Sequence, residues 1–181
     1  MLSNRLDGKR VLLTQSTEFM GTALIETFRA LGAEVIADDR PLDDDPLLPA
    51  QIVQAAGRVD VLLLHLALPA PATAAVDIDD DEWRHVFSHL VDPMPRLVAA
   101  VLPQMLARQQ GRILLIGSAA ALRGQKRTGT YSAARNWLMC SRWGWSWPVR
   151  ASSSMPLHRI LWTTQPTTEP RCRPTRVFRS V

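Results

Sequence analysis

The chain has few of the features that mark membrane proteins or disulfide-stabilised domains. Its 181 residues include only two cysteines, Cys140 and Cys172, whose spacing matches no metal-binding motif. The longest apolar run, near residues 61–67, is strand-sized and too short to span a bilayer. The N-terminus lacks the apolar region of a signal peptide. We therefore expect one cytoplasmic domain with no membrane segment and no metal site.

A basic surface for nucleic acids is also missing. The formal net charge is +4, but residues 1–135 hold 14 Lys and Arg against 16 Asp and Glu. The positive charge comes from residues 136–181, which hold seven arginines and one acid, Glu169. Because the first 135 residues show no basic stripe, we expect no nucleic-acid partner.

Apolar runs that alternate with amphipathic segments predict a parallel α/β domain. Four runs read as buried strands: residues 9–14, 33–38, 59–64 and 112–117. Three segments between them show helical signals: residues 22–31, 51–56 and 79–108, the last with a bend at its prolines. Residues 39–49 are too few for a helix plus a strand, which predicts a compressed or missing crossover.

The stretch from Ser118 to Arg135 carries the main chemical pattern. Ser118 follows the last predicted strand, at the sheet edge where parallel sheets bind ligands. Twelve residues separate Ser118 from Tyr131, the only tyrosine, and Arg135 would share the helical face of Tyr131. A guanidinium beside a phenol favours the ionised phenol. Tyr131 is therefore a candidate proton acceptor, with Ser118 to hold the substrate oxygen.

This spacing resembles the active site of the short-chain dehydrogenase/reductase family, Ser followed by Tyr-x-x-x-Lys. Arg135 stands where that family has lysine, which resembles the signature Ser-x12-Tyr-x3-Arg of its cofactor-independent branch, the halohydrin dehalogenases. The alternative is an ordinary strand end and helix start. The resemblance implies a Rossmann-like doubly wound parallel sheet with helices on both faces, a small-molecule substrate and a homo-oligomer.

The turn after the first strand departs from the family's Thr-Gly-x3-Gly-x-Gly. Here Gln15 and Phe19 replace two glycines between Thr14 and Gly21. Those glycines matter because a residue without a Cβ lets the backbone approach phosphates closely. The replacement resembles the second dehalogenase signature, Thr-x4-Phe/Tyr-x-Gly, whose aromatic residue helps to enclose a halide. We therefore predict Phe19 in a halide or substrate pocket, Thr14 and Gly21 in a degenerate cofactor loop, and no cofactor. Weak binding of NAD or NADP, or Phe19 as a core residue, is the alternative.

Three more positions correspond to cofactor-binding or active-site positions of the family. His65 begins His-Leu-Ala-Leu where cofactor-binding relatives show Asn-Asn-Ala-Gly. Asp38 stands where NAD-preferring relatives bind ribose, but we interpret it as a solvated or helix-capping carboxylate. His89 replaces an asparagine that supports the family's active site, and we interpret it as a core or interface residue.

Residues 136–181 do not continue the pattern. They hold five of the six tryptophans and show no apolar period. Read in a shifted frame, residues 155–165 recode as Asn-Ala-Ile-Ala-Gln-Asn-Phe-Val-Asp-Asn-Pro, which resembles the strand and loop after the family's catalytic helix. We interpret residues 1–135 as a C-terminally incomplete domain and residues 136–181 as an irregular, non-native tail. A genuine divergent tail is the alternative.

Three functions follow from these patterns. In a halohydrin dehalogenase, Tyr131 takes the proton of a vicinal halo-alcohol, Ser118 holds its oxygen, and the oxygen displaces halide near Phe19 to give an epoxide. In an NAD(P)-dependent oxidoreductase, the same Ser and Tyr act on a carbonyl. In a truncated product the pocket lacks a wall, and we expect an inactive, poorly stable chain.

Overall fold

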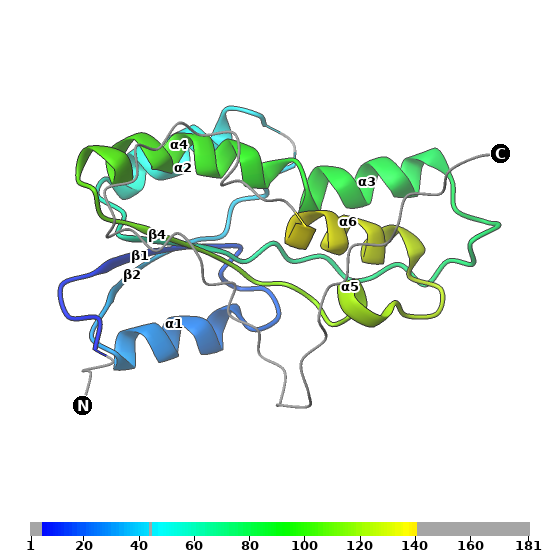
Figure 1. The fold of residues 1–181 in the computed structure, drawn as a ribbon, viewed down its shortest axis with the longest axis horizontal. Coiled ribbons are helices and arrows are strands. Elements are labelled where there is room, and N and C mark those ends of the chain that lie inside the picture. Colours follow the sequence, from blue (N-terminus) through cyan, green and yellow to red (C-terminus); the bar gives the residue numbers. More distant parts are fainter. Residues whose placement is uncertain (1–4, 44, 141–181) are drawn as a thin grey trace, which may run out of the picture.

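The computed structural model describes residues 5–43 and 45–140, which form a parallel four-stranded sheet with helices on both faces (Figure 1). Its strands are β1 (Arg10–Thr14), β2 (Glu34–Asp38), β3 (Val61–Leu64) and β4 (Arg112–Leu115). Their order is β2-β1-β3-β4, and every neighbouring pair is parallel. The strand order reverses between β1 and β3, the switch point where such sheets bind ligands. This confirms the predicted Rossmann-like fold.

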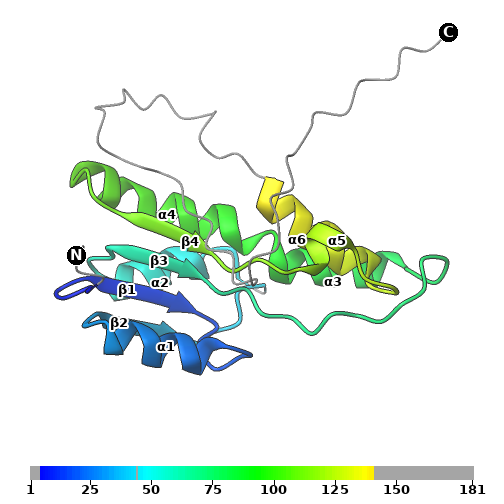
Figure 2. The same ribbon diagram turned by 60° about the horizontal axis from the view of Figure 1, so that its bottom comes forward.

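The described residues form six helices: α1 (Gly21–Ala30), α2 (Leu48–Ala56), α3 (Asp80–Leu90), α4 (Pro93–Ala107), α5 (Ala120–Arg123) and α6 (Gly129–Cys140). Figures 1 and 2 show α2 and α4 on one face of the sheet and α1 on the other. β2 leads to α2 without an intervening strand, as the short crossover predicts. Where the sequence predicts a bend, the structure has a break that separates α3 from α4. The break occurs at the prolines because proline fits the first turn of a helix better than its interior.

Alternation along the strands divides the core into two clusters, one on each face. Leu12, Leu62 and Leu64 pack into the larger cluster, which includes buried residues of α2, α3, α4 and α6. Val11 and Leu63 belong to the smaller cluster, against which half-buried residues of α1 pack. The strands therefore hold the four helices of the larger cluster in fixed positions relative to one another.

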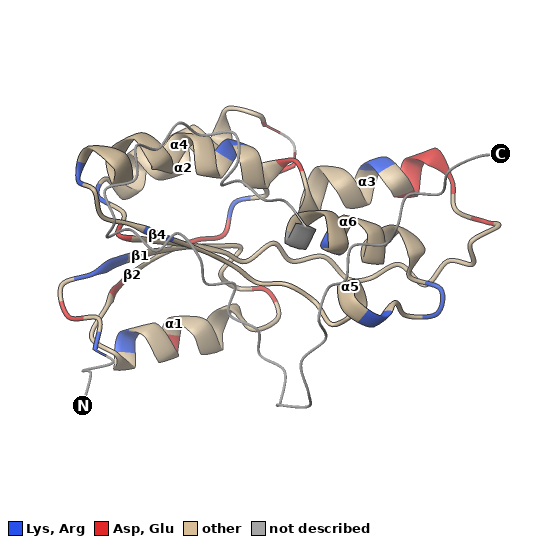
Figure 3. Ribbon diagram, in the orientation of Figure 1, with Lys and Arg blue, Asp and Glu red and all other residues tan. Residues whose placement is uncertain are grey.

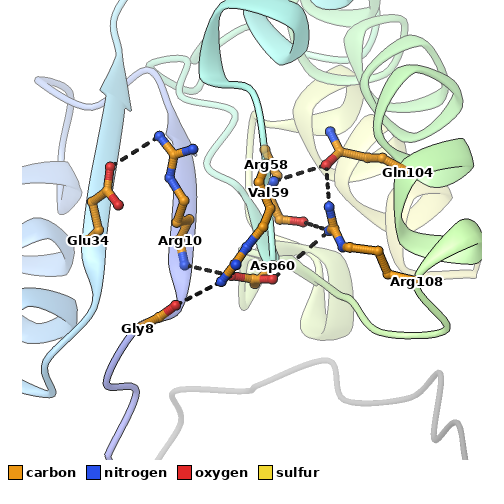
Figure 4. Close-up of polar contacts among 8 residues, drawn as sticks. All are labelled: Gly8, Arg10, Glu34, Arg58, Val59, Asp60, Gln104 and Arg108. Atoms are coloured by element: carbon orange, nitrogen blue, oxygen red, sulfur yellow. Dashed lines mark hydrogen bonds and ion pairs between the residues drawn. The ribbon is translucent and has the colours of Figure 1, made fainter.

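The amino-terminal edge of the sheet is organised around the buried carboxylate of Asp60 (Figure 4). Its Oδ2 accepts hydrogen bonds from the backbone N–H of Arg10 at 2.9 Å and from Arg58 Nη2 at 2.9 Å. Burial, the largest effect, would raise the pKa of Asp60. The hydrogen bonds from Arg10 and Arg58, with the charges of Arg58 and Lys9, outweigh it and hold the pKa below its ordinary value.

Charged residues of both signs are interspersed along the described ribbon, with acids grouped at the start of α3 (Figure 3). Within residues 5–43 and 45–140, no helix is long and apolar enough to cross a membrane. In the same ranges, no group of three or more His, Cys, Asp or Glu residues could hold a metal ion. Of the predicted irregular tail, residues 136–140 belong to α6, and the predictions for residues 141–181 lie outside the described residues.

Candidate active site

Helix α6 places Tyr131 and Arg135 on one face, as their spacing predicts. The guanidinium carbon of Arg135 lies 5.1 Å from the centroid of the Tyr131 ring. Arg135 is buried, and Tyr131 is half-buried. A cation over an aromatic face is attracted by the ring's electron density, and more strongly where water is excluded. The single tyrosine of the chain therefore has a fixed positive charge beside its ring.

Arg135 also joins α6 to the carboxyl ends of two strands. Its Nη2 donates to the carbonyl oxygen of Leu66 at 2.5 Å, and its Nη1 donates to that of Ile116 at 3.3 Å. Leu66 follows β3 and Ile116 follows β4. A planar guanidinium presents several donors at fixed angles, so one side chain can serve both carbonyls. The sequence pattern gave no sign of this second role.

Ser118 lies in the connection from β4 to α5, at the same edge of the sheet. Its Oγ accepts a hydrogen bond from the backbone N–H of Ala120 at 3.3 Å, and its carbonyl oxygen accepts one from Ala121 at 3.1 Å. Both contacts fix Ser118 at the start of α5. Among the described residues, no hydrogen bond joins Ser118 to Tyr131 directly, so a substrate oxygen would have to connect them.

The turn between β1 and α1 has positive φ values at the two positions where the family pattern has glycine. Gln15 and Phe19 adopt left-handed conformations, with φ values of 46° and 43°. A Cβ at Gly21 would clash with the carbonyl oxygen of Ser16, so this position requires glycine. Phe19 is 67% exposed and therefore lies outside the core. Its place in a halide pocket stays a prediction.

Side chains also link the carboxyl ends of β1 and β3. Thr14 Oγ1 lies 3.2 Å from both the N–H and the carbonyl oxygen of His65, and Gln15 Oε1 accepts a hydrogen bond from the N–H of Ala67. His65 Nδ1 lies 3.0 Å from the carbonyl oxygen of Gln15. Because a carbonyl only accepts, that nitrogen carries the proton. Burial, helped by the charge of Arg135, lowers the pKa of His65 and keeps the ring neutral.

The end of β2 carries a charged pair beside this turn. Arg40 Nη2 lies 2.7 Å from Asp38 Oδ2, so Asp38 is ion-paired rather than simply solvated. Asp39 accepts hydrogen bonds from the N–H and the hydroxyl of Thr17, which anchors the turn to β2. His89 Nε2 lies 2.9 Å from Asp43 Oδ2, which gives His89 a partner outside the site.

Residues 6–138 match the family model for short chain dehydrogenases. An uncharacterized oxidoreductase of Bacillus subtilis, YvaG, is 29% identical over 155 residues, which cover 72% of this chain and 58% of that protein. A solved structure named "Dehalogenation enzyme" is 28% identical with a TM-score of 0.65, and the match covers 72% of this chain and 62% of that one. The chain thus spans about three fifths of the length of these relatives.

A third similarity corrects the prediction about cofactors. A gluconate 5-dehydrogenase from Burkholderia cenocepacia has been solved in complex with NADP and tartrate. It has a TM-score of 0.68 and 20% identity, and the match covers 78% of this chain and 68% of that one. Together with the family match over residues 6–138, the NADP bound in that structure contradicts the prediction that no cofactor is involved, which took the loss of two glycines as the loss of the cradle. The turn itself has positive φ values at Gln15 and Phe19 and a close approach of Gly21 to the carbonyl oxygen of Ser16.

Proposed function

Because the chain belongs to the short-chain dehydrogenase family, we propose that its site transfers a proton at a hydroxyl or carbonyl oxygen of a small molecule. Tyr131 exchanges the proton, Ser118 binds the same oxygen, and Arg135 holds a positive charge beside the phenol. The observation that carries the proposal is the buried Arg135 guanidinium over the Tyr131 ring, fixed by two backbone carbonyls. The guanidinium thereby keeps a fixed positive charge beside the phenol that exchanges the proton.

We propose dehalogenation as the specific reaction. The phenolate of Tyr131 accepts the hydroxyl proton of a vicinal halo-alcohol while Ser118 donates a hydrogen bond to the oxygen. The oxygen then bonds to the neighbouring carbon, and the carbon–halogen bond breaks. The products are an epoxide, a halide ion and a proton carried by Tyr131. Arginine at position 135, Phe19 in the turn and the similarity to the structure named "Dehalogenation enzyme" support this reaction.

Oxidoreduction with NAD or NADP is the second candidate, and the positive φ values at Gln15 and Phe19, where the family pattern has glycine, favour it. The main chain around Gly21 and the Asp38–Arg40 pair would hold the phosphates and the ribose. When bound, the cofactor supplies or accepts a hydride. Tyr131 would exchange the proton at the substrate oxygen, and Ser118 would orient that oxygen. The oxidoreductase name of the Bacillus relative also supports this candidate.

One pair of assays on the 181-residue chain separates the candidates. Chloroethanol is supplied, and chloride release is followed with an ion-selective electrode. Ethanol and acetaldehyde are supplied in parallel with NAD(P)+ and NAD(P)H, and nicotinamide absorbance is followed. We expect chloride release that is lost in Tyr131→Phe and retained in Trp83→Phe, an exposed aromatic position. A Tyr131-dependent absorbance change without chloride release would instead establish the oxidoreductase, and silence in both assays would favour the inactive product.

A further inference from the structure

The residues just before Tyr131 are held by the segment that leads into α3. Thr128 forms a parallel β-bridge with Thr73. Gly129, the first residue of α6, packs so closely that a Cβ there would lie 3.3 Å from Cδ1 of Ile78. Thr128, which directly precedes α6, and Gly129, its first residue, are therefore positioned by a segment some fifty residues earlier in the chain.

The third residue, Thr130, makes the strongest of these contacts. It is 1% exposed, and its hydroxyl donates to Oε1 of Glu82 at 2.7 Å. Glu82 lies in the first turn of α3, where its own N–H donates to the capping side chain of Asp79 at 2.8 Å. A buried hydroxyl needs a partner, and a hydrogen bond to a carboxylate is among the stronger ones. The bond therefore joins the start of α6 to a capped turn of α3.

Tyr131 is thus fixed from two directions along α6. Thr130 is bound to α3 one residue before it, and Arg135 is bound to the ends of β3 and β4 one turn after it. The contacts of Arg135 fix α6 against the sheet. At the first turn of the helix, Thr130 adds a side-chain hydrogen bond to α3 beside the backbone contacts of Thr128 and Gly129.

We infer that Glu82 is a positioning residue that sets the place of Tyr131 through the hydroxyl of Thr130. The inference rests on the proposed function only in taking Tyr131 as the acid–base residue. Glu82 touches neither Tyr131 nor any reacting atom, so its effect passes through the backbone between residues 130 and 131. Displacing an acid–base group by about 1 Å can lower the rate a hundredfold.

The first test uses the fact that Tyr131 is the only tyrosine. Protein grown with ring-labelled tyrosine gives NMR ring signals from this residue alone. Glu82→Met and Thr130→Val remove the hydrogen bond, whereas Glu82→Gln and Thr130→Ser keep an acceptor and a donor. We expect the first two variants to shift the Tyr131 signals and the last two to leave them in place. The double variant Glu82→Met/Thr130→Val should shift them no further than either single variant.

Asp81→Asn is the matched control, because it removes a carboxylate from the same helical turn and its side chain is 93% exposed. Unchanged Tyr131 signals in Glu82→Met, or an equal shift in Asp81→Asn, would overturn the inference. If Thr130→Val does not fold, the comparison of Glu82→Met with Glu82→Gln still decides it.

The second test measures chloride release from chloroethanol. We expect kcat to fall about ten- to a hundredfold in Glu82→Met, with little change in KM and with recovery in Glu82→Gln. A fall in Glu82→Gln as large as that in Glu82→Met would contradict positioning by a hydrogen bond. Absence of chloride release from the unaltered chain would count against dehalogenation alone, because the NMR signals of Tyr131 report on its position without any reaction.

Discussion

At the scale of single residues, Arg135 combines an electrostatic and a structural role. Its guanidinium lies over the Tyr131 ring and also donates to two backbone carbonyls. A lysine ammonium is also charged, but as a compact point charge it cannot reproduce the planar fork that spans both carbonyls. The two roles can therefore be separated by exchanging one cation for the other.

Arg135→Lys should keep the charge and lose at least one of the bonds to Leu66 and Ile116. We expect the free energy of unfolding to fall by about 1–3 kcal/mol, because a buried carbonyl loses its donor. The rate of the proposed reaction should fall with it. Urea unfolding and chloride release measure both effects, with the exposed Arg123→Lys as control. If Arg135→Lys is as stable as the unaltered chain, the two carbonyl contacts contribute nothing to folding.

Phe19 combines a backbone conformation that is unfavourable for folding with a proposed function. It adopts a φ of 43° and is 67% exposed, so its ring gains little from packing. Phe19→Gly should remove backbone strain, partly offset by the greater freedom of glycine in the unfolded chain. We expect stability to rise by up to about 1 kcal/mol and chloride release to be lost. Urea unfolding measures the expected rise in stability, and a chloride-release assay on the same preparation measures the expected loss of activity.

Met20→Gly is the control for Phe19→Gly, because Met20 is also exposed but has a φ of −91°. It should bring no gain in stability, since there is no left-handed strain to relieve. A Phe19→Gly variant that is more stable and equally active would leave the aromatic ring without a function in the proposed pocket.

At the scale of elements, Asp60 joins the amino ends of β1 and β3. Its carboxylate accepts hydrogen bonds from the Arg10 backbone and from Arg58, and Arg108 Nη2 lies 3.9 Å from its other oxygen. Arg108 in turn donates to the carbonyl oxygen of Val59 and to Gln104 (Figure 4). One buried carboxylate therefore relates two strands to α4, at the edge opposite the candidate site.

The lowered pKa of Asp60 sets the pH range over which this contact stabilises the fold. Stabilisation is complete above the unfolded-state pKa of about 3.9 and is lost as the pH falls through the lower folded-state pKa. Asp60→Asn should therefore lower the free energy of unfolding at neutral pH by about 1–3 kcal/mol, and the difference from the unaltered chain should shrink in acid. Urea unfolding at several pH values measures this.

Asp81→Asn, at an exposed position, should show neither effect in the same series. A difference between Asp60→Asn and the unaltered chain that stays constant into strong acid would mean that the shape of the side chain, rather than its charge, holds the edge.

The sequence predicted the strands well because each is a short apolar run beside a turn. The helices were predicted less evenly. The break between α3 and α4 was predicted only as a bend, because a proline within a long apolar pattern can either bend a helix or end it. The short helix α5 was not predicted, because its four residues, Ala120–Arg123, are too few to show a period.

In the candidate site, spacing brought Tyr131 and Arg135 together correctly, because four residues apart is a local relation on a helix. The contact between Thr130 and Glu82 joins residues 48 positions apart, and no pattern in either segment indicates it. The two hydrogen bonds from Arg135 to carbonyls at the strand ends could not be predicted from the sequence either, because every residue has a backbone carbonyl. Long-range polar contacts of this kind depend on the packed fold and not on motif.

At the scale of the whole molecule, the two faces of the sheet are covered unequally. The larger cluster receives four helices and includes Leu115 of β4, which is 9% exposed. On the other face α1 packs beside β1 and β2, while Leu114 of β4 is only half-buried (Figure 2). Within the described ranges, β4 is also an edge strand. The matched relatives are longer than this chain. Whether the α1-side face of β4 is covered in this chain can therefore be tested by mutation.

Leu114 and Leu115 form a matched pair for that test, because they are neighbours on β4 and face opposite sides of the sheet. Leu115→Ala should lower the free energy of unfolding by about 2–5 kcal/mol, as expected for a buried leucine. Leu114→Ala should lower it by only about 1 kcal/mol, because less apolar area leaves water on folding. Urea unfolding of both variants of the 181-residue chain gives the comparison. Equal losses would show that a part of the chain beyond the described residues, or a second molecule, covers β4 on the α1 side; dependence of the Leu114→Ala effect on protein concentration would then assign the cover to a second molecule.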